Sequence, residues 1–211
     1  MNANANAIFT LCSRLCMGDG VMPLEPKEWS DLAKKLMIAH SQPSDIFNFS
    51  RSDFKDKLFL TDEYIDRILA LIERNASLTF ELSQLENIGV TIVTRADKEY
   101  PSKLKSALSN NCPPMFYVAG NLNLLNYKYV GYVGSRTVSD DDVEFTKKIV
   151  SKTVNRGFGV VSGGARGIDT AAEEQALNAD SYVIEYLSDS MMKKMKKSAV
   201  TNAVANGKML L

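Results

Sequence analysis

Two loops that combine glycine with arginine constrain the fold more than any other feature of this sequence. The first reads Gly134-Ser135-Arg136 and the second reads Ser162-Gly163-Gly164-Ala165-Arg166-Gly167. Each loop follows a short run of strand-forming residues and precedes a run with helical character. One helix and one strand separate the loops, which is the length of a single β-α-β unit. A right-handed crossover brings both loops to the carboxyl edge of neighbouring parallel strands, where open α/β sheets bind ligands.

Strand and helix signals alternate from residue 90 onward, as in α/β proteins with a parallel sheet. We expect strands at residues 90–93, 115–119, 129–133, 158–161, 182–187 and 208–211. We expect helices at residues 103–108, 139–155, 168–178 and 189–206, the last beginning at Asp189 and Ser190. Ser139 followed by three aspartates is a strong helix start. The fold class is therefore α/β, with a Rossmann-like parallel sheet and helices on both faces.

Residues 7–85 carry helical signals and poor strand signals throughout. After Pro26, a helix at residues 27–38 places four apolar side chains on one face, namely Trp29, Leu32, Leu36 and Met37. Residues 43–52 read as a loop. Thr61 is an expected N-cap, and the helix behind it carries an apolar stripe made of Ile65, Ile68, Leu69 and Ile72. We therefore divide the chain into a small all-α module, residues 1–87, and a Rossmann-like domain, residues 88–211.

Composition narrows the function classes. The chain has 25 basic and 25 acidic residues, so it lacks the basic excess of many nucleic-acid-binding proteins, although a local basic pocket can still hold phosphate. His40 is the single histidine, and the three cysteines are spaced neither for a disulfide framework nor for a complete metal site. No apolar run has the length of a membrane span, and residues 1–7 lack the features of a signal peptide. We expect a soluble, cytoplasmic protein with no membrane partner.

The two loops suit an anion. Glycines let the backbone approach a ligand and turn N–H groups toward it, and the helices that follow present their positive ends. Arg136 and Arg166 each supply a forked cation that can grip a phosphate through two hydrogen bonds. The alternative is purely structural, with Gly163 and Gly164 making a tight turn and the arginines pairing with surface carboxylates. Neither the G-x-G-x-x-G fingerprint after the first strand nor the motif G-x-x-x-x-G-K-[ST] occurs, so we expect no nicotinamide, flavin or other cofactor.

Four motifs, in this order along the chain, resemble the DNA-processing protein A family, also called DprA/Smf. They are Tyr100-Pro101, the stretch Pro113-Pro-Met-Phe-Tyr117 with Gly120-Asn121, Val133-Gly-Ser-Arg136, and Ser162-Gly-Gly-Ala-Arg-Gly-Ile-Asp169-Thr-Ala-Ala172. The resemblance covers residues 88–187 firmly. It covers residues 1–87 loosely, as a helical module of the SAM-like or helix-hairpin type.

This resemblance implies a single-stranded DNA-binding protein that protects incoming DNA and assists the loading of a RecA-type recombinase in transformation and recombination. It also implies a homodimer formed through the Rossmann-like domain, and a protein that is not an enzyme. The DNA phosphates would then be bound by Gly134, Ser135, Arg136, Ser162, Gly163, Gly164, Arg166 and Gly167. Asp169 would be structural, capping the helix behind the second loop.

The chain departs from the family pattern at three places. Glu173 stands where the family has a histidine, and together with Glu174 it would weaken phosphate binding if it faced inward. The strand at residues 183–187 lacks the family's glycine. The family continues beyond the position of Leu211 with more sheet and often a winged-helix domain, so we expect an incomplete domain with a sheet edge that a partner could complete. We interpret the lysine run, Lys193, Lys194, Lys196 and Lys197, as the solvated face of a helix.

Two other functions stay open. One is a nucleotide-binding or nucleotide-hydrolysing protein of the lysine-decarboxylase-like Rossmann family, which shares the glycine-serine-arginine loop and the paired glycines. The catalytic P-G-G-x-G-T-x-x-E block of that family is not present in this sequence. The other is an interaction protein that has lost ligand binding, which the neutral net charge and the pair Glu173 and Glu174 favour and the two loop arginines oppose.

Overall fold

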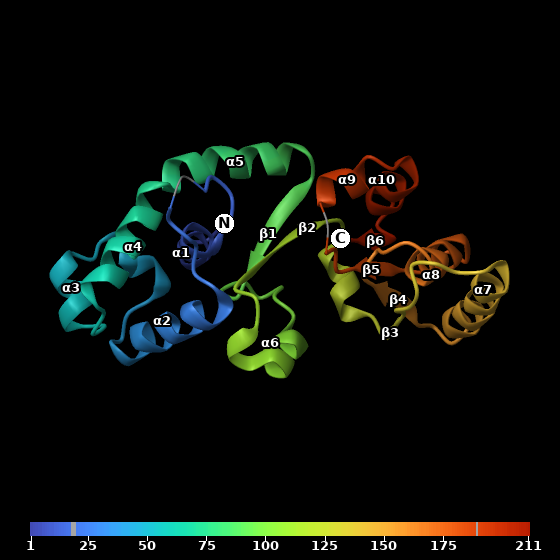
Figure 1. Cartoon of the computed structure of the whole chain (residues 1–211), viewed down its shortest axis with the longest axis horizontal. Coiled ribbons are helices and arrows are strands. Elements are labelled where there is room, and N and C mark those ends of the chain that lie inside the picture. The colour runs from blue at the N-terminus through green and yellow to red at the C-terminus, as the bar shows by residue number, and fades with distance from the viewer. Residues whose placement is uncertain (18–19, 189) are drawn as a thin grey trace. The chain divides into compact units, whose positions relative to one another are not determined.

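The computed structural model describes residues 1–17, 20–188 and 190–211 (Figure 1). The chain forms two compact units, Met1–Tyr117 and Val118–Leu211. Residues 88–117, which the sequence analysis assigns to the Rossmann-like domain, lie in the first unit. They do so because the strand at residues 90–94 packs on helices of the first unit, and Met115 packs against its apolar core. No helix within the described ranges is long and apolar enough to cross a membrane.

The first unit is mainly helical, as expected. Its helices are α1 (Ala3–Cys12), α2 (Pro26–Ile38), η1 (Pro43–Phe47), α3 (Arg51–Asp56), α4 (Asp62–Glu73), α5 (Asn75–Asn87), α6 (Ser102–Leu108) and η2 (Ser109–Asn111). Strands β1 (Val90–Thr94) and β2 (Met115–Ala119) form a two-stranded sheet. Helix α1 begins at Ala3, earlier than the sequence suggested. The side chain of Asn2 caps it by accepting a hydrogen bond of 2.8 Å from the N–H of Ala5.

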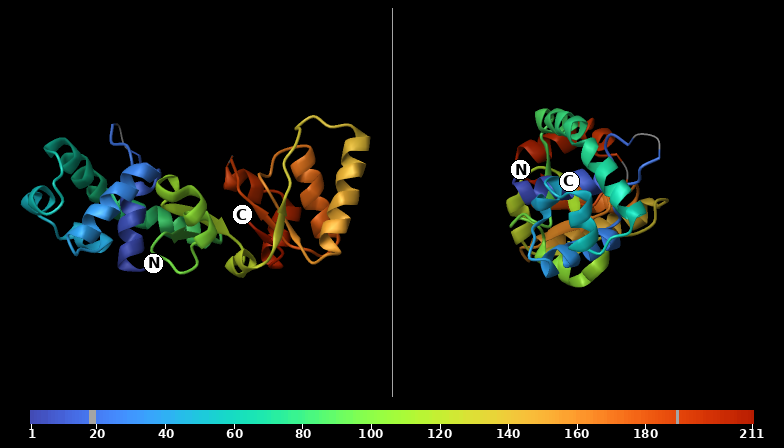
Figure 2. Two further views of the ribbon diagram at one scale, coloured as in Figure 1. Left: turned by 90° about the horizontal axis from the view of Figure 1, so that it is seen from below. Right: turned by 90° about the vertical axis from the view of Figure 1, so that its left-hand side faces the viewer.

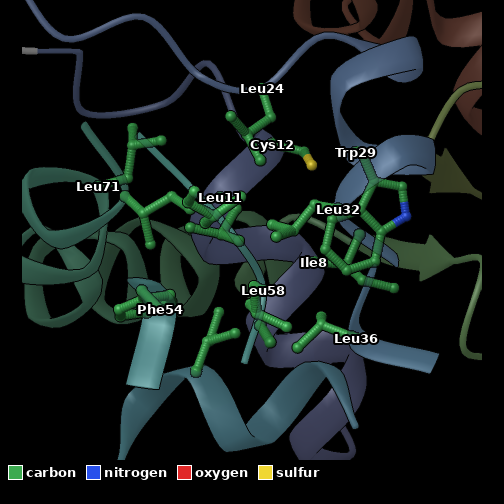
Figure 3. Packing of buried hydrophobic residues seen from close by; sticks show 14 of the residues in the cluster. Ile8, Leu11, Cys12, Leu24, Trp29, Leu32, Leu36, Phe54, Leu58 and Leu71 are labelled. Atoms are coloured by element: carbon green, nitrogen blue, oxygen red, sulfur yellow. The ribbon is translucent and has the colours of Figure 1, made fainter. Parts of the chain in front are cut away.

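Helices α1, α2 and α4 enclose the apolar core of this unit (Figure 3). Trp29, Leu32 and Leu36 of α2 are buried, as their spacing predicts. The assignment of Met37 to the same face is wrong, since its surface is 69% exposed. Met37 follows Leu36 directly and therefore points about 100° further round the helix axis.

Helix α4 confirms the expected cap, because the Thr61 hydroxyl oxygen accepts the N–H of Tyr64 at 3.3 Å. Ile65 and Ile68 are fully buried, whereas Leu69 and Ile72 pack against the core while partly exposed. The loop expected at residues 43–52 instead contains η1 and the start of α3. Both elements begin with a capping arrangement in which a side chain at the third helical position bonds back to the cap.

The second unit confirms the expected α/β class. Its four parallel strands lie in the order β3 (Tyr129–Gly131), β4 (Gly159–Ser162), β5 (Val183–Glu185) and β6 (Met209–Leu210). The connecting helices are η3 (Leu122–Asn126), α7 (Asp140–Val154), α8 (Ile168–Asn178), α9 (Met191–Met195) and α10 (Ser198–Ala205). Figures 1 and 2 show α7 and α8 lying side by side against the sheet.

The two faces of this sheet have different covers, because strand side chains alternate between faces. Val160, Val183 and Met209 are in register and fully buried. Ser162 points to the same side as Val160 and contacts α8 through Glu173. On the opposite face, Ile184 and Leu210 pack against Leu124 of η3. Helices therefore flank both faces, with only a short 3-10 helix on the second.

The last helix and the edge of the sheet at β6 differ from expectation. The single helix expected at residues 189–206 is two helices, α9 and α10, because the backbone at Lys197 is extended. Its expected first residue, Asp189, lies outside the described residues. At the sheet edge formed by β6, Ala119 and Leu211 exchange two backbone hydrogen bonds of 3.0 Å. This edge is thus paired within the unit.

Candidate functional site

The two glycine- and arginine-bearing loops lie against each other, as the β-α-β spacing predicts. The carbonyl oxygen of Ser135, in the first loop (residues 134–136), accepts a 3.2 Å hydrogen bond from the N–H of Ile168. Gly167 closes the second loop (residues 162–167) with a φ of +82°, and a Cβ there would overlap the backbone of Ser135 and Arg136. A Cβ on Gly134 would lie 2.6 Å from a side-chain carbon of Ile168. Both loops therefore need glycine in order to approach this closely.

The loops form part of a pocket with a volume of about 470 Å³, which we call the basic pocket. Its lining consists of Arg136, Gly163, Gly164, Ala165, Arg166, Leu187, Ser188, Ser190, Lys193, Lys194 and Lys197. Five of these side chains are cationic, and none of the lining residues that the structure describes carries a carboxylate. The pocket combines the ends of β3, β4 and β5, which is the edge where the sequence analysis placed a ligand.

Four of the eight residues expected at the site line the basic pocket, namely Arg136, Gly163, Gly164 and Arg166. The other four have supporting positions. Gly134 and Gly167 permit the contact between the loops, and Ser162 is buried beneath them. The Ser135 hydroxyl donates to the carbonyl oxygen of Thr137 at 2.5 Å, so its side chain is engaged within its own loop.

Three backbone N–H groups of the second loop, which were expected to turn toward a ligand, form hydrogen bonds within the protein instead. Those of Gly163 and Ala165 donate to one carboxylate oxygen of Asp169, at 3.1 and 3.4 Å. The N–H of Gly164 donates to the Ser162 hydroxyl oxygen at 3.3 Å. Asp169 is thus structural, but instead of capping α8 as expected it holds the loop from the first turn of that helix. An anion in the basic pocket would be bound mainly by side chains.

The two arginines are available for such an anion. Both side chains belong to exposed residues at the loop tips. Neither guanidinium forms a hydrogen bond or ion pair with any described residue, so the alternative in which they pair with surface carboxylates has no support in this part of the chain. Because arginine presents its donors in a planar fork, the pair suits a phosphate or another oxyanion.

A buried polar group lies directly beneath the second loop, and we call it the Lys194 cluster. Its members are Lys194, Glu173 and Glu185, with the hydroxyl of Ser162. Lys194 Nζ forms ion pairs with Glu185 Oε1 and, at 3.3 Å, with Glu173 Oε2. It also lies 3.5 Å from the carbonyl oxygen of Gly164. The Ser162 hydroxyl donates to Glu173 Oε1.

Burial controls the protonation of this cluster. Burial, followed by the neighbouring Glu173, raises the pKa of Glu185 to about 8, against the opposing effect of Lys194. Burial lowers the pKa of Lys194, but the two carboxylates outweigh it and the pKa is raised. Burial therefore favours the neutral form of Glu185, whose pKa is raised, and the nearby carboxyl groups favour the charged form of Lys194.

The structure shows whether Glu173 and Glu174 face the pocket and whether the lysine run is solvated. Glu173 is buried and does not line the pocket, and Glu174 is exposed outside it. The interpretation of the whole lysine run as a solvated face is wrong for Lys194, whose side chain is only 10% exposed. Lys193 and Lys197 line the pocket. Their place in the chain just after β5 was the available signal, because parallel strands share one carboxyl edge.

No group of three or more histidine, cysteine or acidic side chains is placed to hold a metal ion within residues 1–17, 20–188 and 190–211. The structure thus presents a cation-lined pocket supported by a buried ion cluster. Comparisons with known proteins identify the family of the chain. Residues 91–211, more than half of the chain, match the family described as DNA recombination-mediator protein A.

The chain belongs to this family. The match confirms the resemblance drawn from the four motifs, and it begins within a few residues of the expected start of the Rossmann-like domain. The chain is also similar to two curated relatives. It is 39% identical to DNA processing protein DprA from Streptococcus pneumoniae over 67 residues, which are 32% of this chain and 23% of that protein.

The second relative is Protein Smf from Synechocystis sp., at 31% identity over 128 residues, covering 58% of this chain and 31% of that protein. The matched segments thus span less than a third of either relative. Among solved structures, the chain is similar to the X-ray structure of DNA processing protein A (DprA) from Streptococcus pneumoniae, with a TM-score of 0.61. The sequence identity is 22%, covering 90% of this chain and 67% of that chain, and this likeness supports the fold.

Proposed function

We propose that this chain binds single-stranded DNA by holding its phosphates in the basic pocket. The observation that carries the proposal is the convergence of Arg136 and Arg166, from two adjacent strand ends, on one pocket that also contains three lysines. Phosphate contacts by arginine and lysine supply most of the sequence-independent affinity for nucleic acids. The zero net charge of the chain does not oppose this, because the cations are concentrated where the phosphates would lie.

The shape of the site favours a single strand over a duplex. A pocket of about 470 Å³ has the size of a small-ligand site. A flexible strand can bend a phosphate and its sugar into such a space, whereas the backbone of a rigid duplex stays on its cylinder and reaches only the rim. Leu187 adds an apolar surface beside the cations, which suits contact with a sugar or a base.

The family supports a more specific role. Its description is that of a recombination mediator, and the two curated relatives carry the names DNA processing protein DprA and Smf. We propose that the whole protein protects incoming DNA and assists a RecA-type recombinase during transformation and recombination. We also propose that it acts as a homodimer and as a binding protein without catalytic activity.

One observation favours a second candidate, a protein that binds mononucleotides. The volume of the basic pocket is sufficient for a nucleotide, and its cations would hold the phosphates. This function predicts tight binding of a free nucleotide, whereas the proposed function predicts affinity that grows with the length of the strand.

Fluorescence anisotropy with labelled oligonucleotides separates these possibilities. The full chain is titrated against a dA/dC oligonucleotide, the matched duplex, and the single strand in the presence of excess mononucleotide. The proposal expects binding of the single strand that weakens as salt rises, weaker binding of the duplex, and little competition by the nucleotide. Absence of binding at low salt contradicts the proposal. Displacement by low concentrations of mononucleotide supports the second candidate.

A further inference from the structure

Helix α9 carries one wall of the basic pocket, yet apolar burial does little to hold it. It has five residues, Met191–Met195, and none of them is fully buried. Isolated helices of this length are unstable in water, so α9 depends on tertiary contacts for its position. The side chain of Lys194, which is 10% exposed, supplies contacts of this kind.

Lys194 connects α9 to three other segments of the unit. Its ammonium group meets Glu173 of α8, Glu185 at the end of β5 and the carbonyl oxygen of Gly164 in the second loop. The side chains of Glu173 and Glu185 are 5% and 0% exposed. A buried ion pair that loses one partner leaves an uncompensated charge and is strongly destabilised. The cluster therefore anchors α9 through buried contacts of Lys194 with Glu173 and Glu185.

We propose that Lys194 is a positioning residue, which docks α9 on the second loop so that Lys193 and Lys197 face the phosphates of a bound strand. This inference rests on the proposed function and refines it. Lys193 and Lys197 lie one residue before and three residues after Lys194, and both line the pocket together with Arg136 and Arg166. The charge of Lys194 faces its own carboxylates, so its role is to position the residues beside it.

Glu173 has a specific part in this arrangement. The family pattern has histidine at its position, and a histidine would offer Lys194 no negative charge. With glutamate there, the Ser162 hydroxyl and Lys194 bind the two oxygens of one carboxylate. Asp169 is the other buried acid nearby, and its carboxylate accepts hydrogen bonds from the loop amides of Gly163 and Ala165. Asp169 thus supports the loop through Gly163 and Ala165, whereas Glu173 reaches it through Ser162, whose hydroxyl oxygen accepts the N–H of Gly164.

Hydrogen exchange of the full chain tests the docking without any ligand. The test variant is Glu173→Gln plus Glu185→Gln, which removes both partners of Lys194 while keeping the side-chain shapes. Amides of α9 are expected to exchange at least about tenfold faster, because a buried ammonium without a counter-charge leaves its site. Peptides from β4 and α8 report whether the rest of the unit stays folded. The control, Glu144→Gln plus Glu174→Gln, removes two exposed carboxylates and is expected to leave α9 unchanged.

Binding of a dA/dC oligonucleotide to the same variants distinguishes positioning from a simple charge effect, because the two predict opposite changes in affinity. If the carboxylates acted only through their charge, removing them would tighten binding, because less negative charge would face the phosphates. Positioning predicts the reverse, a loss of about three- to tenfold with a shallower salt dependence. Unchanged exchange of α9, or tighter binding by the test variant, overturns the inference. Hydrogen exchange tests the docking of α9 without DNA. If the wild-type chain binds no DNA, the proposed function fails, but the docking of α9 can still be confirmed or contradicted.

Discussion

The carbonyl oxygen of Ser135, in the loop after β3, and the backbone N–H of Ile168, the first residue of α8, form a hydrogen bond of 3.2 Å. This bond fixes the distance between the loops that carry Arg136 and Arg166. It forms only because Gly167, directly before Ile168, has no side chain to push the loops apart. The spacing of the two arginines therefore depends on a backbone contact that a single added methyl group would disturb.

Gly167→Ala is expected to destabilise the chain more than Gly157→Ala. Both glycines have positive φ values, +82° and +78°, so an alanine is strained at either position, and the ψ of −124° puts Gly167 outside the left-handed helical region that other residues can adopt. A Cβ at Gly157 meets no atom within 4 Å, whereas one at Gly167 overlaps the first loop. That overlap adds about 1–3 kcal/mol. Chemical denaturation of the two variants measures the difference, and equal losses would show that the loops are not in contact.

Leu36 and Met37 of α2 offer a second comparison. Leu36 is 1% exposed within the helical core and Met37 is 69% exposed. Leu36→Ala is expected to lower the free energy of unfolding by about 2–5 kcal/mol. Met37→Ala is expected to change it by less than about 0.5 kcal/mol, as for most exposed positions. Thermal unfolding of both variants is the measurement, and a large loss for Met37→Ala would place that side chain in the core after all.

The Lys194 cluster predicts a pH dependence of stability. The pKa of Glu185 is raised to about 8 by burial and by Glu173, whereas an unfolded glutamate has a pKa of about 4.3. Between these values the folded chain keeps a proton that the unfolded chain has lost. The contribution of this group to stability is therefore full below about pH 4 and is lost as the pH rises toward 8.

Glu185→Gln removes this titration. The difference in unfolding free energy between the wild-type chain and the variant should shift against the wild type between about pH 5 and pH 8. Denaturation followed by circular dichroism at several pH values measures it. Glu173, Lys194 and Asp169 are the charged groups buried near Glu185 in the described part of the unit, and all are present in both proteins. If the difference in unfolding free energy between the two proteins did not change with pH, the raised pKa of Glu185 would be contradicted.

Lys197→Ala tests a lysine that lines the pocket directly. The variant is expected to bind single-stranded DNA about three- to tenfold more weakly, with a salt slope reduced by about 0.7, because one phosphate contact is lost. Lys148→Ala is the matched control, since Lys148 is exposed on α7 and paired with Glu144. Anisotropy over a series of salt concentrations gives both quantities. Equal salt slopes for the two variants would remove Lys197 from the site.

Much of the fold could be read from local signals. The expected strand at residues 115–119 and the expected helix at residues 168–178 have the bounds of β2 and α8. Ser139 caps α7 as its position before three aspartates predicts. Local signals failed where a cap was overlooked, as at Asn2, or where a helix broke without glycine or proline, as at Lys197.

The site was harder to predict from the sequence than the fold. The positions of Arg136 and Arg166 followed from topology, because strand ends in one β-α-β unit meet at one edge. The engagement of the loop amides by Asp169 and the burial of Lys194 did not follow, since both depend on partners that only the folded chain brings together. A lysine in a basic run looks exposed until its two carboxylate partners are located.

The most direct test of the account is oligonucleotide binding by the Arg136→Ala plus Arg166→Ala variant. Its control, Lys148→Ala plus Arg156→Ala, removes two cations that do not line the basic pocket. The account predicts that the pocket variant loses at least about 100-fold in affinity for single-stranded DNA, and that its salt slope falls by about 1.4. It also predicts that the control binds nearly as the wild type does. Equal affinity and equal salt slopes for the two variants would contradict binding at this pocket.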